Sequence, residues 1–536
     1  MRVLSGRIEL LTAEIHFADR IRFDCNSQSE GNHVCNILCS HKIIMACVTT
    51  QVPRHTVAIL GGGIAGLSAA YYINRKYGPS VRPVIFEASG RSGGWVQSFK
   101  NDNSLFEVGP RTIRPAGVPG MSTLDLIEEI GLDGNINYVP ADHPSAKTRF
   151  IHLNGRLVRL PMELATLWKT VEPFDRPVSQ TLLKEIFIPR KKVEDDSLHG
   201  FVSRRFGQRI ADTVIDPLVR GVCAGDARKI SAKFIFGPGP LGIEQKYGSV
   251  VLGGTLMTIL RRQHPDPHEN FPNLKEIGTS TLATTARSEG WSVWTLEAGL
   301  ESFPVKLKEK LTEAGVAIHE NSSVKSIIFD EGRQSSEVEY LDSKTNTLNK
   351  LECSHVISAI PSLNLASILE NSKPNLSSIS RNLRTIGSAD VTVTNLKYPG
   401  NVLELQAFGF LVPSIEKELE GLLGVVFNTC SFPQGEDTIL TVMSQGIDID
   451  TIDKHIRNIL GLKDPSVVDV RLLSNCIPQY TVGHYERVEN LRKLIQESKL
   501  PLTLIGASYD GVSVNDCVFS GRKASEYLPL DSIRSG

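Results

Sequence analysis

Cysteine is scarce in this chain, which holds nine cysteines among 536 residues. Domains that depend on disulfides are short and much richer in cysteine, so a disulfide scaffold is excluded. An excess of positive charge is also lacking, because the formal net charge is −1, and nothing in it points to nucleic acid. No stretch approaches the roughly 18 consecutive apolar residues of a membrane-spanning helix. Any contact with a membrane is therefore expected along its surface.

The chain is too long for one hydrophobic core, and two or three domains are expected. Residues 1–52 are predicted to be a leader outside the fold. They contain Glu9, Glu14, Asp19 and Asp24, whereas a mitochondrial presequence is rich in arginine and poor in acids. Four cysteines lie in this leader, but their spacings match no standard zinc motif, so no metal site is predicted.

The strongest local signal is an apolar run, residues 57–60, that leads into a Gly-x-Gly-x-x-Gly sequence and then a helical pattern. A strand, a tight turn and a helix are the context that a dinucleotide-binding fingerprint requires. Gly61 permits the turn, Gly63 allows the backbone to approach a pyrophosphate, and Gly66 allows close packing of helix on strand. The binding residues predicted here are Gly61, Gly62, Gly63, Ile64, Ala65 and Gly66.

A second apolar strand ends in Glu87, at the distance from Gly66 where a ribose-binding carboxylate is expected. A carboxylate there accepts hydrogen bonds from ribose hydroxyls and repels a 2′-phosphate, which disfavours NADP. FAD and NAD share this fingerprint, so the residues that follow must decide between them. The sequence from Arg91 to Gly94 resembles the Arg-x-Gly-Gly element of the glutathione-reductase-like flavoproteins, which favours FAD. Its predicted cofactor contacts are Ala88, Arg91, Gly94 and Trp95.

In the glutathione-reductase-like flavoproteins that the sequence resembles, the last segment returns to the flavin, and the same is expected of this chain. Residues 502–505 form a buried-strand pattern, and a helical pattern begins near Val514, with Ser513 or Asn515 as its cap. The positive end of that helix can stabilise negative charge on a reduced flavin. Residues 324–328 and 356–360 are both predicted to be buried parallel strands. The two strands resemble their counterparts in the same flavoprotein group, where the first supplies a backbone contact to the adenine half. The cofactor contacts expected in these segments are Val324, Ala507, Val512, Ser513 and Val514.

From about Val57 to the C-terminal helix, the sequence resembles the animal-type protoporphyrinogen oxidases. The phrases that carry the resemblance stand in order at residues 106–117, 149–150, 220–225, 408–413, 476–481 and 506–512. The resemblance implies an α/β fold, with a Rossmann-like FAD-binding domain of the glutathione-reductase and amine-oxidase type, a sheet-based substrate domain and a helical membrane-binding domain. The predicted boundaries are 1–52 for the leader, 53–143, 275–360 and 481–536 for the FAD-binding domain, 144–260 for the helical insertion, and 361–480 for the substrate domain.

The resemblance also implies a reaction. Protoporphyrinogen IX loses six electrons to give protoporphyrin IX, the ring system that precedes haem, in three flavin cycles. Dioxygen reoxidises the flavin each time, giving three hydrogen peroxide. One non-covalent FAD per chain is expected, because no cysteine lies in a context that resembles a covalent flavin attachment. The chemistry belongs to the flavin, so no catalytic side chain is assigned.

Site residues are carried over from the family onto matching positions. Arg149 is expected to bind a substrate propionate, because arginine offers a planar fork to a carboxylate. Phe408 and Leu411 are expected to sandwich the flat ring, with Gly409 between them in sequence. Residues beside the flavin are expected to be Gly109, Pro110, Arg111 and Thr112. The resemblance places such proteins on the intermembrane-space face of the mitochondrial inner membrane, and it allows a homodimer and transfer of product to ferrochelatase.

Two other interpretations stay open from the sequence. The chain could be a neighbouring FAD-dependent oxidase, such as an amine oxidase or a carotenoid desaturase. An amine oxidase is expected to face its flavin with two aromatic side chains, and Tyr509 is the one candidate. The chain could also be a non-catalytic scaffold that binds flavin, although the intact glycine fingerprint and Glu87 argue against lost cofactor binding.

Overall fold

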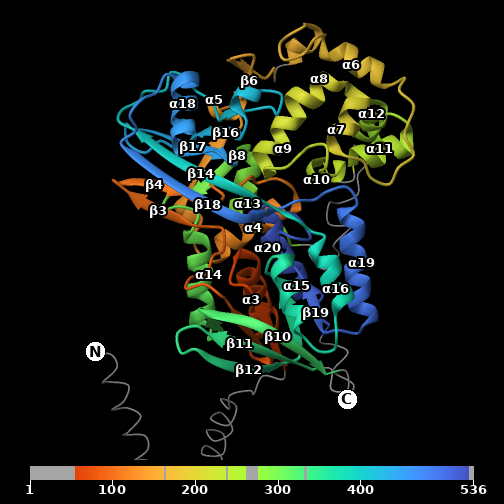
Figure 1. Ribbon diagram of the computed structural model, residues 1–536, viewed down its shortest axis with the longest axis vertical. Coiled ribbons are helices and arrows are strands. Elements are labelled where there is room, and N and C mark those ends of the chain that lie inside the picture. Colours follow the sequence, from red (N-terminus) through yellow and green to blue (C-terminus); the bar gives the residue numbers. More distant parts are fainter. Residues whose placement is uncertain (1–54, 162–163, 237–238, 261–275, 331–334, 530–536) are drawn as a thin grey trace, which may run out of the picture. The chain divides into compact units, whose positions relative to one another are not determined.

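The computed structural model describes residues 55–161, 164–236, 239–260, 276–330 and 335–529 (Figure 1). The predicted leader, residues 1–52, lies outside the described residues. The described chain contains a parallel cofactor sheet, a larger mixed sheet and a helical region between two strands of the mixed sheet.

The cofactor sheet has five strands in the order β19-β13-β1-β2-β9, and every neighbouring pair is parallel. The strands are β1 (His55–Leu60), β2 (Val81–Phe86), β9 (Ala317–His319), β13 (His355–Ser358) and β19 (Leu502–Leu504). A parallel sheet is covered on both faces, which explains the nearly continuous apolar runs in its central strands. The parallel strand predicted at residues 356–360 and the strand predicted at 502–505 are confirmed.

The parallel strand predicted at residues 324–328 was wrong. These residues belong to β10 (Ser322–Asp330), which pairs antiparallel with β11 (Ser335–Asp342) in a separate sheet completed by β12 (Thr347–Cys353). Two buried residues, Ile327 and Phe329, alternate along β10 and face the core on one side only. A short apolar run shows that a strand is buried, but it does not show which strand it pairs with or in which direction.

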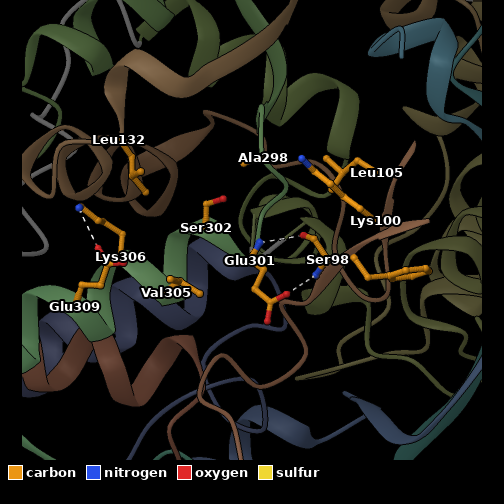
Figure 2. A pocket seen from close by; sticks show the side chains of 11 residues that line it. Ser98, Lys100, Leu105, Leu132, Ala298, Glu301, Ser302, Val305, Lys306 and Glu309 are labelled. Atoms are coloured by element: carbon orange, nitrogen blue, oxygen red, sulfur yellow. Dashed lines mark hydrogen bonds and ion pairs between the residues drawn. The ribbon is translucent and has the colours of Figure 1, made fainter. Parts of the chain in front are cut away.

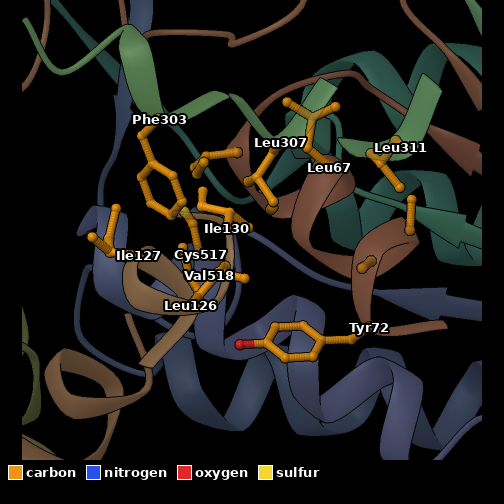
Figure 3. Close-up of a cluster of buried hydrophobic side chains, with 14 of the residues drawn as sticks. Leu67, Tyr72, Leu126, Ile127, Ile130, Phe303, Leu307, Leu311, Cys517 and Val518 are labelled. Carbon is orange, nitrogen blue, oxygen red and sulfur yellow. The ribbon is translucent and has the colours of Figure 1, made fainter. Parts of the chain in front are cut away.

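Helices cover both faces of the cofactor sheet. On one face lie α3 (Ile64–Tyr77), α4 (Gly117–Glu129), α14 (Ser302–Glu313) and α20 (Val514–Glu526), whose apolar side chains form the core shown in Figure 3. On the other face lie α15 (Ser362–Glu370), α16 (Ser377–Arg384) and α19 (His484–Glu497). A Cβ at Gly521 would lie 2.7 Å from the Ala69 nitrogen, so glycine is what lets α20 approach α3 this closely.

The mixed sheet has seven strands in the order β18-β14-β17-β16-β15-β6-β7. They are β6 (Phe150–Leu153), β7 (Arg156–Arg159), β14 (Ser388–Tyr398), β15 (Gly409–Leu411), β16 (Leu422–Phe427), β17 (Thr438–Ser444) and β18 (Val467–Pro478). Only the β15–β6 pair is parallel. That pair joins an early segment to a late one, and helix α18 (Ile449–Leu460) packs into the same core.

A helical region follows β7 in the sequence. Its main helices are α6 (Val178–Glu185), α7 (Leu198–Phe206), α9 (Asp216–Cys223), α10 (Ala232–Phe236), α11 (Gly239–Tyr247) and α12 (Val250–Leu260). A short helix, α8 (Gln208–Ile210), continues through a π-helical turn (Ala211–Ile215) into α9. Within the described residues, every helix falls short of the length and hydropathy needed to cross a bilayer.

Short elements complete the fold. Two further antiparallel pairs are the hairpin of β3 (Ser98–Asn101) with β4 (Ser104–Glu107), and β5 (Ile136–Pro140) with β8 (Trp291–Leu296), which come from distant parts of the chain. The remaining helices are α5 (Pro144–Lys147), α13 (Thr281–Ser288) and α17 (Asn428–Ser431). In the part of the chain that the structure describes, the 3-10 helices are Gly78–Ser80, Asp133–Asn135, Leu164–Trp168 (η3) and Lys417–Leu419.

Candidate cofactor and substrate site

The turn from β1 into α3 has the backbone that its glycines predict. Gly61 has a φ of +101°, and a Cβ at Gly66 would lie 2.0 Å from the Gly61 oxygen. Gly63 is the N-terminal cap of α3 and offers no side chain to the first-turn N–H groups. The first-turn N–H groups, which begin with those of Ile64 and Ala65, are therefore available to an anion at the positive end of the helix.

A second glycine loop faces this turn. The Gly93 nitrogen donates a 2.8 Å hydrogen bond to the Gly62 oxygen, and Gly93 and Gly94 both have positive φ. A Cβ at Gly63 would lie 3.8 Å from the Gly94 Cα, and a Cβ at Gly94 would lie 3.2 Å from the Gly63 Cα. Two backbones without side chains thus form a cradle that fits the pyrophosphate of a dinucleotide.

Glu87 lies at the end of β2 beside this cradle. Its carboxylate accepts hydrogen bonds of 2.8 Å from the Gly62 nitrogen and of 2.8 and 2.7 Å from the Ser89 nitrogen and hydroxyl. The Ser322 nitrogen donates to the Glu87 oxygen over 2.8 Å. That bond brings the beginning of β10, and with it Val324, alongside Glu87. The predicted ribose and adenine contacts therefore lie together, although β10 belongs to another sheet.

Arg91 holds the glycine loop together. Its guanidinium forms a 3.0 Å ion pair with Glu301 and donates to the carbonyl oxygen of Gly94. Glu301 in turn accepts a 2.9 Å hydrogen bond from the Ser98 nitrogen. Figure 2 shows Ser98 and Glu301 in the wall of a pocket of about 490 Å³ beside α14. None of the predicted site residues lines that pocket, and the contacts of Arg91 are with Gly94 in the glycine loop and with Glu301.

Arg111 carries a positive charge, and part of its guanidinium has no hydrogen-bond partner in the described structure. Its Nη1 lies 3.8 Å from the Met443 sulfur, and its buried Nε has no hydrogen-bond partner in the described structure. Burial lowers the pKa of Arg111 to about 10, opposed by the charge of Glu107. A buried donor without an acceptor is costly, so Arg111 fits a cofactor that brings an oxygen or nitrogen acceptor to it.

Glu107 is a site residue that the sequence reasoning missed. It is buried and accepts hydrogen bonds from the Leu300 nitrogen at 2.9 Å and the Ser98 hydroxyl at 2.7 Å. Burial raises the pKa of Glu107 to about 7, against the pull of those hydrogen bonds and of Arg111. The only signal in the sequence was the position of Glu107 within residues 106–117, and the family resemblance assigned no role to this glutamate.

The C-terminal segment returns to the dinucleotide helix, as the sequence predicts. A Cβ at Gly506 would lie 3.4 Å from the Ala65 Cβ, and α20 begins directly after Ser513. The Ser513 hydroxyl accepts a hydrogen bond from the Asp516 nitrogen in a capping box, so Ser513 rather than Asn515 is the cap. Asn515 instead donates a 2.8 Å hydrogen bond to the Arg114 oxygen. The turn containing Ala507 and Val512 therefore lies between the start of α3, around Ala65, and the segment that includes Arg114.

Tyr480 supports this turn and was also missed. Its hydroxyl donates to the Ala507 oxygen at 2.7 Å and accepts from the Gly511 nitrogen at 2.8 Å. Tyr480 is 1% exposed, and its ring stacks on His484 with 3.7 Å between centroids. Residues 476–481 contribute only to the family resemblance, because the sequence around a tyrosine does not indicate which distant turn its side chain contacts.

The predicted substrate residues gather at the β15–β6 junction. The Phe408 nitrogen donates to the Thr148 oxygen at 3.1 Å, and the Arg149 guanidinium carbon lies 5.5 Å from the centre of the Phe408 ring. The Arg149 Nη1 donates to the Ala146 oxygen at 2.7 Å, and Arg149 has no ion pair within the described residues. Burial and the charge of Arg114 lower the pKa of Arg149. An unpaired, partly buried arginine fits a ligand carboxylate.

A cross-strand row connects the substrate residues to the cofactor residues. Leu411 of β15 is paired with Gly424 of β16, which is paired with Met443 of β17. Paired residues point to the same face of a sheet, and the Leu411 side chain packs over Gly424, where a Cβ would lie 2.9 Å from the Leu411 Cδ2. Since Met443 contacts Arg111, the face that carries Leu411 continues to the predicted flavin position. Gly409 is required in β15, because its φ is +145° and a Cβ would lie 2.0 Å from the Val425 oxygen.

The other predicted contacts lie in the same segments. Trp95 is exposed, and its carbonyl oxygen would be 2.0 Å from a Cβ at Gly109, so glycine is needed there. Ala88 is exposed beside Glu87. The half-buried residues in these segments are Pro110, Thr112, Val324, Val512 and Val514. Tyr509 is fully buried in the apolar core on the far side of the cofactor sheet and so is no candidate to face a flavin.

Comparison with known proteins identifies the family. Residues 64–528 match the family described as flavin containing amine oxidoreductase. Human protoporphyrinogen oxidase is 39% identical over 494 residues, which cover 88% of this chain and 97% of the human protein. The Schizosaccharomyces pombe protoporphyrinogen oxidase is 30% identical over 505 residues, or 88% of this chain and 98% of the yeast protein.

Solved structures agree at the level of fold. A putative protoporphyrinogen oxidase from Exiguobacterium matches with a TM-score of 0.67 and 22% identity over 89% of this chain and 99% of that chain. Cyclohexylamine oxidase from Brevibacterium oxydans matches with a TM-score of 0.60 and 13% identity over 90% and 100% of the respective chains. The dinucleotide cradle, the unpaired arginines and the identity to the curated relatives agree: the chain belongs to the flavin-containing amine oxidoreductases and, among them, to the protoporphyrinogen oxidase family.

Proposed function

We propose that this protein is an oxygen-dependent protoporphyrinogen oxidase that holds one non-covalent FAD per chain. Protoporphyrinogen IX gives up six hydrogens to become protoporphyrin IX, and three dioxygen molecules take them up as three hydrogen peroxide. The observation that carries the proposal is the row from Leu411 through Gly424 to Met443, which joins the unpaired Arg149 region to the unpaired Arg111. A flat apolar substrate with a carboxylate suits one end, and a flavin suits the other.

The chain's own residues would bind and orient the cofactor. Glu87 accepts from the ribose, and the first turn of α3 together with Gly94 receives the pyrophosphate. Arg111 supplies positive charge beside the ring system, and the first turn of α20 adds its dipole. When bound, FAD supplies the two-electron acceptor that no side chain provides.

The substrate is proposed to be held by charge and shape. Arg149 binds a propionate, and the Phe408 ring beneath its guanidinium keeps the fork in a fixed plane. Leu411 lies against the macrocycle, and α9 backs it, since a Cβ at Gly221 would lie 2.3 Å from the Leu411 Cδ2. Fixing the ring in this way would hold a reacting carbon of the substrate at the flavin, while the protons released in each cycle pass to water.

We further propose that the helical region rests on a membrane. The apolar face, as we call it, consists of exposed side chains on η3, α6, the turn after α6, and α12: Trp168, Leu183, Phe187, Leu252, Leu256 and Met257. Phe187 is 84% exposed and Trp168 is 73% exposed, which is unusual for large apolar residues. The mitochondrial inner membrane, a homodimer and transfer of product to ferrochelatase stay proposals that rest on the family resemblance.

The proposed reaction is tested by mixing anaerobically prepared protoporphyrinogen IX with the purified yellow protein in air. Porphyrin fluorescence and peroxide are followed together against a control without protein. Porphyrin formation well above the control, with about three peroxides per ring, is the expected result. A protein that holds FAD but gives no rate above the control would overturn the proposed substrate and direct attention to amines and carotenoids.

A further inference from the structure

The apolar face is mounted on a buried polar network. Glu185, at the end of α6, is fully buried and forms an ion pair with Arg205. Its carboxylate also accepts hydrogen bonds from the Val250 and Val251 nitrogens at 2.9 and 3.2 Å, at the beginning of α12. Arg205 donates to the Ile188 oxygen at 2.8 Å and to the Gly248 oxygen at 2.9 Å. The two helices that carry most of the apolar face are thus tied to each other.

A positively charged cleft of about 720 Å³ lies in the same region. Its charged lining consists of Arg190, Lys192 and Lys233 with a single acid, Glu194. None of the three cations forms an ion pair with a carboxylate in the part of the chain that the structure describes. This is unlike the neighbouring Lys191, which lies 3.3 Å from Asp196. The cleft therefore keeps an excess of positive charge that the protein itself does not neutralise.

The walls of the cleft are ordered by backbone contacts. The Arg190 Nη1 donates to the Gln245 oxygen at 2.8 Å, and the Gln245 side chain donates back to the Lys191 oxygen at 2.6 Å. Gln245 lies on α11, which leads directly into α12. Phe187, the most exposed member of the apolar face, stands only three positions before Arg190. One continuous segment therefore passes from the apolar face to the cleft.

We propose that this cleft binds the phosphate-bearing headgroup of an anionic lipid while the apolar face lies among the acyl chains. The inference rests on the proposed membrane contact and adds the chemistry of the lipid. Apolar side chains bordered by unpaired lysine and arginine are the pattern of proteins that lie in an anionic bilayer surface. The negative charge of the phosphate would neutralise Arg190, Lys192 and Lys233, which have no carboxylate partner in the described part of the chain. The bound headgroup would also fix the orientation of the protein on the membrane.

The test measures binding of the holoenzyme to vesicles of phosphatidylcholine alone and of phosphatidylcholine mixed with phosphatidylglycerol. The variant R190Q/K192Q/K233Q is expected to bind the anionic vesicles about 100-fold more weakly than the parent, with little change on neutral vesicles. The control K344Q/K463Q/K499Q removes three exposed charges from other parts of the chain, and it should bind like the parent. A second variant, Phe187→Ser, should weaken binding to both kinds of vesicle.

The outcomes separate the proposals. If the parent binds neutral and anionic vesicles equally, or if the control loses as much affinity as the cleft variant, the headgroup site is overturned and membrane contact stands. If the parent binds no vesicle, both membrane proposals fail. Porphyrinogen oxidation, measured in the same preparations in detergent, reports separately on the proposed reaction. FAD content shows that the cleft variant is folded.

Discussion

The hydroxyl of Tyr480 donates a hydrogen bond to the carbonyl oxygen of Ala507 over 2.7 Å, across a gap of 27 positions in the chain. The Tyr480 carbonyl oxygen in turn accepts a 2.8 Å hydrogen bond from the Ser231 nitrogen, just before α10 in the helical region. Tyr480 therefore contacts both the proposed membrane-bound region and the turn that is predicted to border the flavin. It ties the position of that turn to the rest of the molecule.

Replacing Tyr480 by phenylalanine should weaken FAD binding. The change keeps the stack on His484 but removes the bonds to Ala507 and Gly511, at about 1 kcal/mol each. The expected result is a rise in the FAD dissociation constant of roughly tenfold or more, measured by titrating apoprotein. Tyr527→Phe, at an exposed tyrosine just after α20, is the matched control. Unchanged FAD affinity in Tyr480→Phe would show that the turn holds its shape without the hydroxyl.

Gly63→Val should abolish FAD retention. A β-branched side chain at this cap would fill the space in front of Gly94, where the pyrophosphate is expected, and valine has few rotamers with which to avoid it. The measurement is the flavin absorbance per chain after gel filtration. Gly134→Val serves as control, because a Cβ at Gly134 meets nothing within 4 Å. A fully yellow Gly63→Val protein would exclude the cradle as the pyrophosphate site.

Arg149→Ala should weaken substrate binding and leave FAD content unchanged. A hydrogen bond to a charged group contributes about 1.5–3 kcal/mol, so a rise in KM of roughly 10- to 100-fold is expected. Steady-state kinetics with protoporphyrinogen IX would measure it. The control is Arg156→Ala, since Arg156 is exposed and pairs with Glu172 away from Phe408. Equal KM values for Arg149→Ala and the parent would remove Arg149 from the substrate site.

Glu107 should make the apoprotein less stable as the pH rises. The fold raises the pKa of Glu107 from 4.5 to about 7, chiefly through burial. The folded state thus holds this proton more tightly than the unfolded chain. The stabilising contribution is complete below about pH 4.5 and is lost as the pH rises through about 7, a difference on the order of 3 kcal/mol.

The measurement is the urea midpoint of apoprotein as a function of pH. Glu107→Gln has no such proton, so its midpoint should improve relative to the parent between about pH 5 and about pH 8. Glu309→Gln, at an exposed glutamate of α14, should run parallel to the parent. Parallel curves for Glu107→Gln and the parent would mean that Glu107 keeps an ordinary pKa in the fold.

The sequence predicted the elements whose signals are local. The glycine turn after β1, the strand at β13 and the cap at Ser513 each depend on residues adjacent in the chain, and each is found where expected. The pairing of β10 was predicted wrongly, because the direction of a strand depends on a partner that a single segment does not reveal.

The site was predicted in part for the same reason. The positions that the family resemblance supplied lie in two groups that the structure brings together through Arg111 and Met443. Met443 could not be found beforehand, because its place opposite Gly424 is a matter of strand register across β16 and β17. Glu107 and Tyr480 depend on contacts with Leu300 and Ala507, which lie far away in the chain.

The order of strands in the cofactor sheet also bears on how the protein is made. The edge strand β19 and the helix α20, which lies on α3 through Gly521, come from the last part of the chain. At about 5–20 residues per second, a ribosome needs on the order of tens of seconds to travel from β2 to α20. Throughout that time the part of α3 that packs on α20 lacks its partner, although α4 and α14 belong to the same core. We therefore expect FAD to bind only after α20 has been made, because the turn before this helix is predicted to border the flavin.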